Sequence, residues 1–149
     1  MQVVSGIMDN HKPKLVLPVC SVPQTYSVQV EGDINNFSLG AALASADVNV
    51  EGFQNRGFWR LKSNNRDCWF AGTEHKGART KGPEQLPCPS KADVTIDPQK
   101  GTLSLAVDGE DYGVVCDSLP TTEPLCFAVG LNDPRIKVTL LSANPGNAT

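Results

Sequence analysis

Apolar and polar residues alternate along much of the chain, a pattern that places apolar side chains on one face of a β-strand and polar side chains on the other. In residues 26–31, for example, a tyrosine and two valines alternate with serine, glutamine and glutamate. The pattern predicts strands at residues 26–31, 37–43, 92–96, 102–107, 112–116, 127–131 and 136–140. No amphipathic helix is convincing, because the alanine-rich stretch SLGAALASADV continues the alternation that starts at Phe37.

Turn-forming residues separate the predicted strands. They stand at residues 97–101, 108–109, 119–120 and 132–134 and are mainly Asp, Asn, Gly and Pro. The Asp108-Gly109 pair suits a tight hairpin, because glycine adopts a positive φ without steric cost. Many short strands with regular turns, and no alternation of strands with helices, indicate an all-β fold: a two-layer antiparallel β-sandwich.

The chain length of 149 residues suits one domain. We place the sandwich at residues 20–141, after an N-terminal tail or leading strand at residues 1–19 and before a C-terminal tail at residues 142–149. The stretch from Glu74 to Ser90 is polar and rich in glycine and proline, so it is the longest predicted loop.

The net charge and the lack of long apolar segments argue against nucleic acids and membranes as binding partners. Thirteen basic and sixteen acidic residues give a formal charge of −3, whereas nucleic-acid-binding domains usually carry a basic excess. No apolar run approaches the roughly 20 residues of a membrane helix, and the N-terminal sequence lacks the basic region and apolar core of a signal peptide. We therefore expect neither a nucleic-acid nor a membrane partner, and a cytoplasmic location.

Five cysteines are spread along the chain, at Cys20, Cys68, Cys88, Cys116 and Cys126. Their odd number and the lack of a CxxC pair favour free thiols in a reducing compartment over disulfides or a zinc site. No cofactor or metal is expected. The sequons at Asn36 and Asn147 would matter only in a secreted protein.

Catalytic readings find little support in the sequence. Carboxylates at Asp108, Glu110 and Asp111 lack the spacing of a calcium loop, so we interpret them as turn and edge residues. Cys68 and His75 are a conceivable nucleophile and base, but nothing in the sequence orients the imidazole. The other histidine, His11, falls in the predicted tail. We expect no enzymatic activity.

Aromatic and arginine residues are better candidates for a site, because such residues are enriched among the energetic anchors of interfaces. They gather between Phe53 and Phe70, where Trp59 is expected in the core. The turn of residues 132–135 adds an arginine that is able to bind a carboxylate. Tyr112 follows the Asp108-Gly109 turn and is placed either inside or at the rim. The candidate binding residues are Arg56, Arg66, Trp69, Tyr112, Asp133 and Arg135.

Several segments together carry a resemblance to a known family. Residues 101–104 read Gly-Thr-Leu-Ser and lead into the Asp108-Gly109 turn, and residues 125–131 read LCFAVGL. Upstream stand YSVQV, FSLGAA and GFWRLKSNNRDCWFAG. From about residue 20 to residue 141 the chain resembles a SPRY domain, in which a GTLSF-x-x-NG hairpin precedes an LYPAVSL strand. Leu105 replaces the usual Phe, so the resemblance is to a divergent member.

The resemblance implies a concanavalin A-like jelly roll that recognises a peptide or protein surface through its rim loops, without catalysis. It also implies a place within a larger ubiquitin-ligase or signalling chain. Because sandwiches of this shape also host lectins, carbohydrate binding is the alternative function. A structural or oligomerising module is a third possibility.

Overall fold

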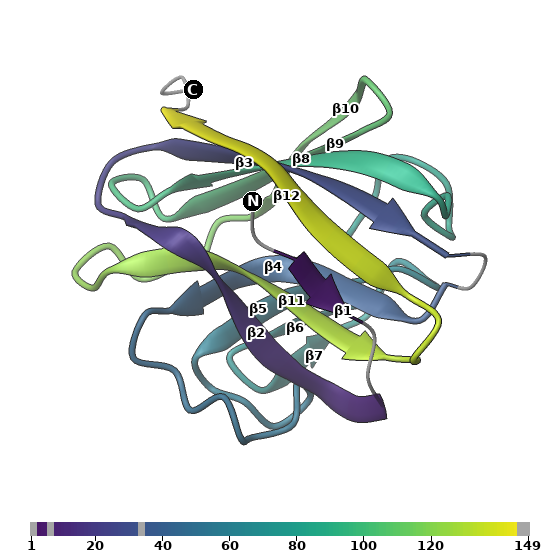
Figure 1. Cartoon of the computed structure of the whole chain (residues 1–149). Helices are drawn as coiled ribbons and strands as arrows, with labels where there is room; N and C mark the ends of the chain where they lie inside the picture. Colours follow the sequence, from purple (N-terminus) through teal and green to yellow (C-terminus); the bar gives the residue numbers. More distant parts are fainter. Residues whose placement is uncertain (1–2, 6–7, 33–34, 146–149) are drawn as a thin grey trace.

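The computed structural model describes residues 3–5, 8–32 and 35–145, and these form two antiparallel β-sheets of six strands each, packed face to face (Figure 1). No helix occurs in the described residues. In order across the sheet, sheet A consists of β1 (Val3–Ser5), β12 (Lys137–Pro145), β3 (Gln24–Glu31), β8 (Ser90–Asp97), β9 (Thr102–Val107) and β10 (Glu110–Cys116). In the same way, sheet B consists of β2 (Met8–Cys20), β11 (Leu125–Asn132), β4 (Phe37–Leu43), β5 (Phe58–Lys62), β6 (Cys68–Phe70) and β7 (Thr73–His75).

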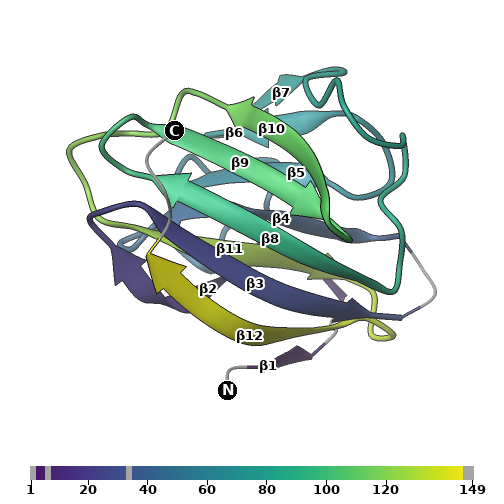
Figure 2. The ribbon, with the colours of Figure 1, turned by 90° about the horizontal axis from the view of Figure 1, so that it is seen from above.

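The core lies between the two sheets and is built from the alternating apolar positions. In β3, Tyr26, Val28 and Val30 point inward, and the ring of Tyr26 stacks on Phe127 of β11 with 5.5 Å between the ring centroids. Seen from above sheet A, β3, β8 and β9 run across the molecule over the strands of sheet B (Figure 2). The predicted all-β sandwich is thus confirmed, because period-two alternation requires a second apolar layer to cover the buried face.

The outer face of sheet B is also covered, over part of its area. Ala42, Phe58 and Ala128 form a second apolar cluster there, against which Leu15 and Ala46 pack. Ala46 belongs to the loop of residues 44–57 between β4 and β5, which we call the cover loop. It lies on the side of sheet B that faces away from sheet A (Figure 1). This is why β4 and β11 are buried along almost their whole length on both faces.

Both ends of the sandwich extend beyond the expected boundaries. Residues 8–20 form β2, which pairs with β11, so this part of the expected tail or leading strand is a leading strand. Strand β12 continues to Pro145 along β3, past the boundary placed at residue 141. The sequence pattern hid both extensions because the registers shift: β2 carries positive φ angles at Asn10 and His11, and β12 shifts by one residue after Leu140.

The Asp108-Gly109 hairpin has the expected primed-turn geometry, since φ is positive at both residues, 50° and 83°. The nearby carboxylates serve the backbone: Asp108 Oδ1 accepts a hydrogen bond from Lys91 N at 2.8 Å, and Asp111 Oδ1 accepts one from Gly113 N at 2.7 Å. The hairpin is therefore scaffold.

The predicted long loop runs from Lys76 to Pro89, between β7 and β8. Its centre is the guanidinium of Arg79, which is 1% exposed and donates to the carbonyl oxygens of Lys81, Glu84 and Asn65 at 2.9, 2.8 and 3.3 Å. It also lies 5.9 Å from the centroid of the Tyr112 ring. One buried cation thus fixes a segment that has no strand of its own.

Candidate binding site

A pocket of about 380 Å³ lies on the outer face of sheet B, between the cover loop and the strand ends. We call it the Arg60 pocket. It draws on β2, β5, β6, the end of β11 and three connecting segments, and its lining residues are Asn10, His11, Asn36, Phe53, Arg60, Lys62, Asn64, Trp69 and Asn132. Residues far apart in sequence therefore meet here through the strand order alone.

The buried wall of the pocket is Arg60, in the middle of β5. Its neighbours Trp59 and Leu61 face the core between the sheets, so strand alternation turns Arg60 to the outer face. The side chain is only 3% exposed, and its Nε donates to Ser38 Oγ at 2.8 Å. Burial lowers the pKa of Arg60 to about 10, which leaves the guanidinium charged at neutral pH.

His11 lies beside this cation. Its Nδ1 is 3.1 Å from the Gly130 carbonyl oxygen, to which it donates, and also 3.1 Å from Ser38 Oγ. A Cβ at position 130 would lie 2.9 Å from His11 Cβ, so glycine is what allows this approach. Burial, followed by the charge of Arg60, lowers the pKa of His11 to about 4. The imidazole is therefore neutral at physiological pH.

Two aromatic rings form another wall. Trp69 of β6 stands opposite Arg60 in the β5–β6 register, and the ring of Phe53 meets it edge-on with 6.2 Å between centroids. Phe53 is 37% exposed and is carried by the cover loop. That loop is tied to β2 by a hydrogen bond from Gly52 N to Asn10 O at 3.0 Å. The aromatic wall is therefore held in place by backbone contacts.

Asparagine side chains form the rim, and they are linked to one another. Asn36 Nδ2 donates to Asn132 O at 3.1 Å, and Asn10 N donates to Asn132 Oδ1 at 3.0 Å. Asn10 Nδ2 in turn donates to Glu51 Oε1 at 3.1 Å. The arrangement combines a buried cation, hydrogen-bonding amides and aromatic surface, which is the composition of a site for a polar ligand with some apolar area.

Comparison with solved structures identifies the architecture. The SPRY domain of human HERC1 superimposes with a TM-score of 0.75 at 10% sequence identity, covering 99% of this chain and 91% of that chain. The PSpry domain of TRIM65 gives a TM-score of 0.62 at 9% identity, covering 95% of this chain and 93% of that chain. This chain has the SPRY fold. No protein-family model matches the sequence, and no curated protein matches it.

Within the SPRY fold, the predicted site residues do not converge on one place. Trp69 lines the Arg60 pocket. Arg66 is half-buried on the far side of the β5–β6 turn, where its Nη1 donates to Arg79 O at 3.3 Å. Arg56 is exposed and lines a different pocket of about 430 Å³ within the cover loop. Two of these three residues therefore lie outside the Arg60 pocket.

The other three predicted residues are engaged within the protein. Tyr112 is 4% exposed and packs against the long loop, so of its two expected placements the interior one holds. Asp133 accepts hydrogen bonds from Arg135 Nε and Nη2 at 3.0 and 2.9 Å, and these bonds lower the pKa of the Asp133 carboxyl. The sequence predicts that Arg135 binds a carboxylate, and in the structure this carboxylate is that of Asp133, two residues earlier in the same turn.

Sequence reasoning missed Arg60, His11 and the rim asparagines. One signal was available for Arg60, because a charged residue between two core residues of a strand must face the opposite side of its sheet. The sequence pattern does not indicate that the cover loop lies over this outer face of sheet B. The sequence predicts a tail around His11, because the alternation of β2 is interrupted there, where the structure has a positive φ of 58° at His11.

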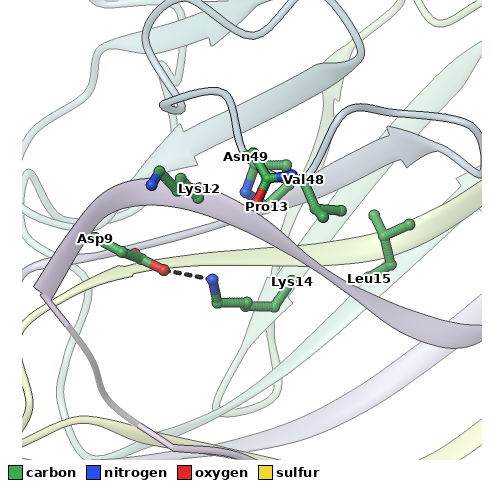
Figure 3. A pocket seen from close by; sticks show the side chains of 7 residues that line it. All are labelled: Asp9, Lys12, Pro13, Lys14, Leu15, Val48 and Asn49. Carbon is green, nitrogen blue, oxygen red and sulfur yellow. Dashed lines mark hydrogen bonds and ion pairs between the residues drawn. The ribbon is translucent and has the colours of Figure 1, made fainter.

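A larger pocket of about 560 Å³ lies between β2 and the cover loop and is lined by Asp9, Lys12, Pro13, Lys14, Leu15, Val48 and Asn49 (Figure 3). Two of its charged side chains already pair with each other, since Lys14 Nζ binds the Asp9 carboxylate. The Asp9 carboxylate in its lining already has a counterion in Lys14, whereas Arg60 has no counterion among the described residues. The Arg60 pocket is therefore the better candidate for a site of ligand recognition.

The conceivable Cys68–His75 pair stands in one cross-strand register, β6 to β7. Cys68 is fully buried, and this burial raises the pKa of its thiol to about 12, so a thiolate nucleophile is strongly disfavoured at neutral pH. All five cysteines are free. The described residues contain no cluster of three or more side chains suited to a metal ion. They also contain no helix long and apolar enough to span a membrane.

Proposed function

We propose that this SPRY-fold domain is a non-catalytic module that recognises a peptide or protein surface, and that the Arg60 pocket is its contact point. The observation that carries the proposal is the pocket itself. Two aromatic side chains and a buried cation meet there with several amides, on a framework of paired strands. Rigid strands that present a few aromatic and arginine anchors are typical of protein-recognition sites.

The position of the pocket supports the same proposal. Its outer wall is the cover loop, and loops on a rigid scaffold commonly carry binding. Phe53 brings exposed aromatic area beside Trp69, and the rim asparagines bring amide groups that are able to hydrogen-bond with a peptide backbone. The larger ubiquitin-ligase or signalling chain and the cytoplasmic location stay predictions.

Selection of random dodecamer peptides displayed on phage, with the full chain immobilised, tests the function. We expect recovered peptides to lose at least tenfold in affinity on Phe53→Ala or Trp69→Ala, with little change in the melting temperature. Leu141→Ala on β12 of sheet A is the matched control, because Leu141 is 45% exposed, lies in the other sheet and does not line the pocket. Peptides that bind both pocket variants as tightly as the wild type would contradict the proposal.

Carbohydrate binding is the second candidate, and one observation favours it. Trp69 and Phe53 stand beside Asn36, Asn64 and Asn132 in a single pocket, and aromatic rings flanked by amides suit the stacking and hydrogen bonding of a sugar. A glycan array on the full chain separates the two functions. Strong glycan signals that vanish in Trp69→Ala, together with no recovered peptide, would favour the lectin reading.

A further inference from the structure

Arg60 is a buried cation that has no counterion among the described residues. Its side chain is 3% exposed, and its one hydrogen bond in the described part of the chain is that from Nε to Ser38 Oγ. A guanidinium has five N–H donors, so four have no protein acceptor there. Burying an unpaired charge is costly in free energy, and proteins ordinarily offset this cost with an opposite charge and further hydrogen bonds.

A comparison with Arg79 shows that the situation of Arg60 is unusual within this fold. Arg79 is equally buried, but three carbonyl oxygens accept hydrogen bonds from its guanidinium. Arg60 instead lines an open pocket of about 380 Å³. Arg79 therefore makes three hydrogen bonds within the protein, although its buried Nε has no partner among the described residues, whereas Arg60 makes one. More donors of Arg60 are left for a ligand, which favours a recognition role for Arg60 and a structural role for Arg79.

The charges around the pocket point to the chemistry of the missing acceptor. Lys62 also lines it, His11 is neutral, and no carboxylate is among the described lining residues. Two acidic side chains near the pocket in the described part of the chain are engaged elsewhere: Asp9 pairs with Lys14, and Glu51 accepts a hydrogen bond from Asn10. The pocket is therefore positive although the whole chain carries a charge of −3.

We propose that the Arg60 pocket binds the carboxylate of an aspartate or glutamate side chain in a peptide ligand. Arg60 and Lys62 supply charged donors to the carboxylate oxygens, and a guanidinium is able to bind both oxygens at once. The aromatic wall of Phe53 and Trp69 contacts the methylene groups and the flanking residues of the peptide. This inference rests on the proposed function and assigns it a ligand chemistry.

The test uses peptides selected from the random dodecamer library against the full chain at neutral pH. We expect the recovered peptides to share an Asp or Glu at one position, and its replacement by Asn or Gln to weaken binding at least tenfold. In Lys62→Gln and Arg60→Gln, the affinity ratio between the acidic peptide and its amide counterpart should fall toward one. Arg66→Gln is the matched control, because Arg66 lies outside the pocket, and it should keep the wild-type ratio.

A second measurement on the wild type covers the case in which Arg60→Gln does not fold. Binding of the acidic peptide should raise the pKa of His11 in an NMR titration, because the carboxylate offsets the neighbouring charge of Arg60; the amide peptide should not. Acidic and amide peptides that bind within twofold of each other, with no difference in the His11 titration, overturn the carboxylate proposal and leave the peptide-binding function standing.

Two further outcomes count against the proposal. If no peptide is recovered, the proposed function fails and the inference fails with it. N-acetylneuraminate and glucuronate are included as acidic sugars, and either one binding more tightly than every acidic peptide would assign the carboxylate to a glycan instead.

Discussion

His11 links the stability of the fold to pH, and the size of the effect follows from its surroundings. Burial and the charge of Arg60 hold its pKa at about 4 in the fold, against an ordinary value of 6.5. When folding lowers the pKa of a histidine, the unfolded chain binds more protons than the folded chain. The free energy of unfolding therefore decreases as the pH falls from above 6.5 to below 4. Of the charged neighbours, Asp9 acts in the opposite direction, but its effect is the weakest.

Between pH 7.5 and pH 5 this linkage costs about 2 kcal/mol of unfolding free energy, and it approaches about 3 kcal/mol below pH 4. The interval above pH 5 is informative because most carboxylates remain ionised there. Urea denaturation at constant ionic strength, repeated at half-unit steps of pH, measures the effect. The wild type should lose about 2 kcal/mol over this range.

His11→Asn should remove most of that dependence. Asparagine tolerates the positive φ of 58° at this position, and its amide nitrogen is placed to donate to the Gly130 carbonyl as Nδ1 does. The matched control is His75→Asn on the exposed strand β7, which should keep the wild-type pH profile. A wild type whose stability is flat from pH 7.5 to pH 5, or a His11→Asn profile that matches it in slope, would refute the reasoning.

Three further substitutions test the scaffold by urea or thermal denaturation. Gly109→Val should lower the free energy of unfolding by about 1 to 3 kcal/mol, because valine resists the φ of 83° at the hairpin. Asp108→Asn should leave it nearly unchanged, and equal effects of the two substitutions would contradict the primed turn. Arg79→Met should cost about 2 to 4 kcal/mol by leaving buried carbonyl groups of the long loop unsatisfied, and a proteolysis pattern unchanged between residues 76 and 89 would argue against its role. Trp59→Ala should cost about 3 to 5 kcal/mol as a core truncation, and a loss below about 1 kcal/mol would place Trp59 outside the core.

Several of the strands that the sequence predicted have two faces in different environments. Residues 26–31 and 102–107 alternate because one face packs on the core and the other is more open to solvent, so the local pattern records the sheet. The Asp108-Gly109 turn was equally predictable, because its φ angles depend on the two residues themselves. The partner chosen for each strand was not, since strand order depends on contacts across the whole chain.

The Arg60 pocket shows where sequence information ends for the site. Trp69 was predictable because it stands in the segment of residues 53–70, which is rich in aromatic and arginine residues, and such residues are enriched among interface anchors. Asp133 and Arg135 also have side chains suited to binding a charged ligand. They lie in one tight turn, however, where they form a salt bridge with each other. Nothing in a linear sequence distinguishes an arginine that already has a carboxylate from one that does not.

The sequence by itself therefore determined the all-β class, most strands and the hairpin of this protein, because these follow from local alternation and turn geometry. Only the tertiary structure decided that β2 belongs to the sandwich, that Tyr112 faces inward and that Arg60 is covered. Each of these depends on segments far apart in the chain: β2 on β11, Tyr112 on the long loop, and Arg60 on the cover loop. Burial is a property of such non-local packing, and burial is what turns an ordinary strand arginine into a candidate site.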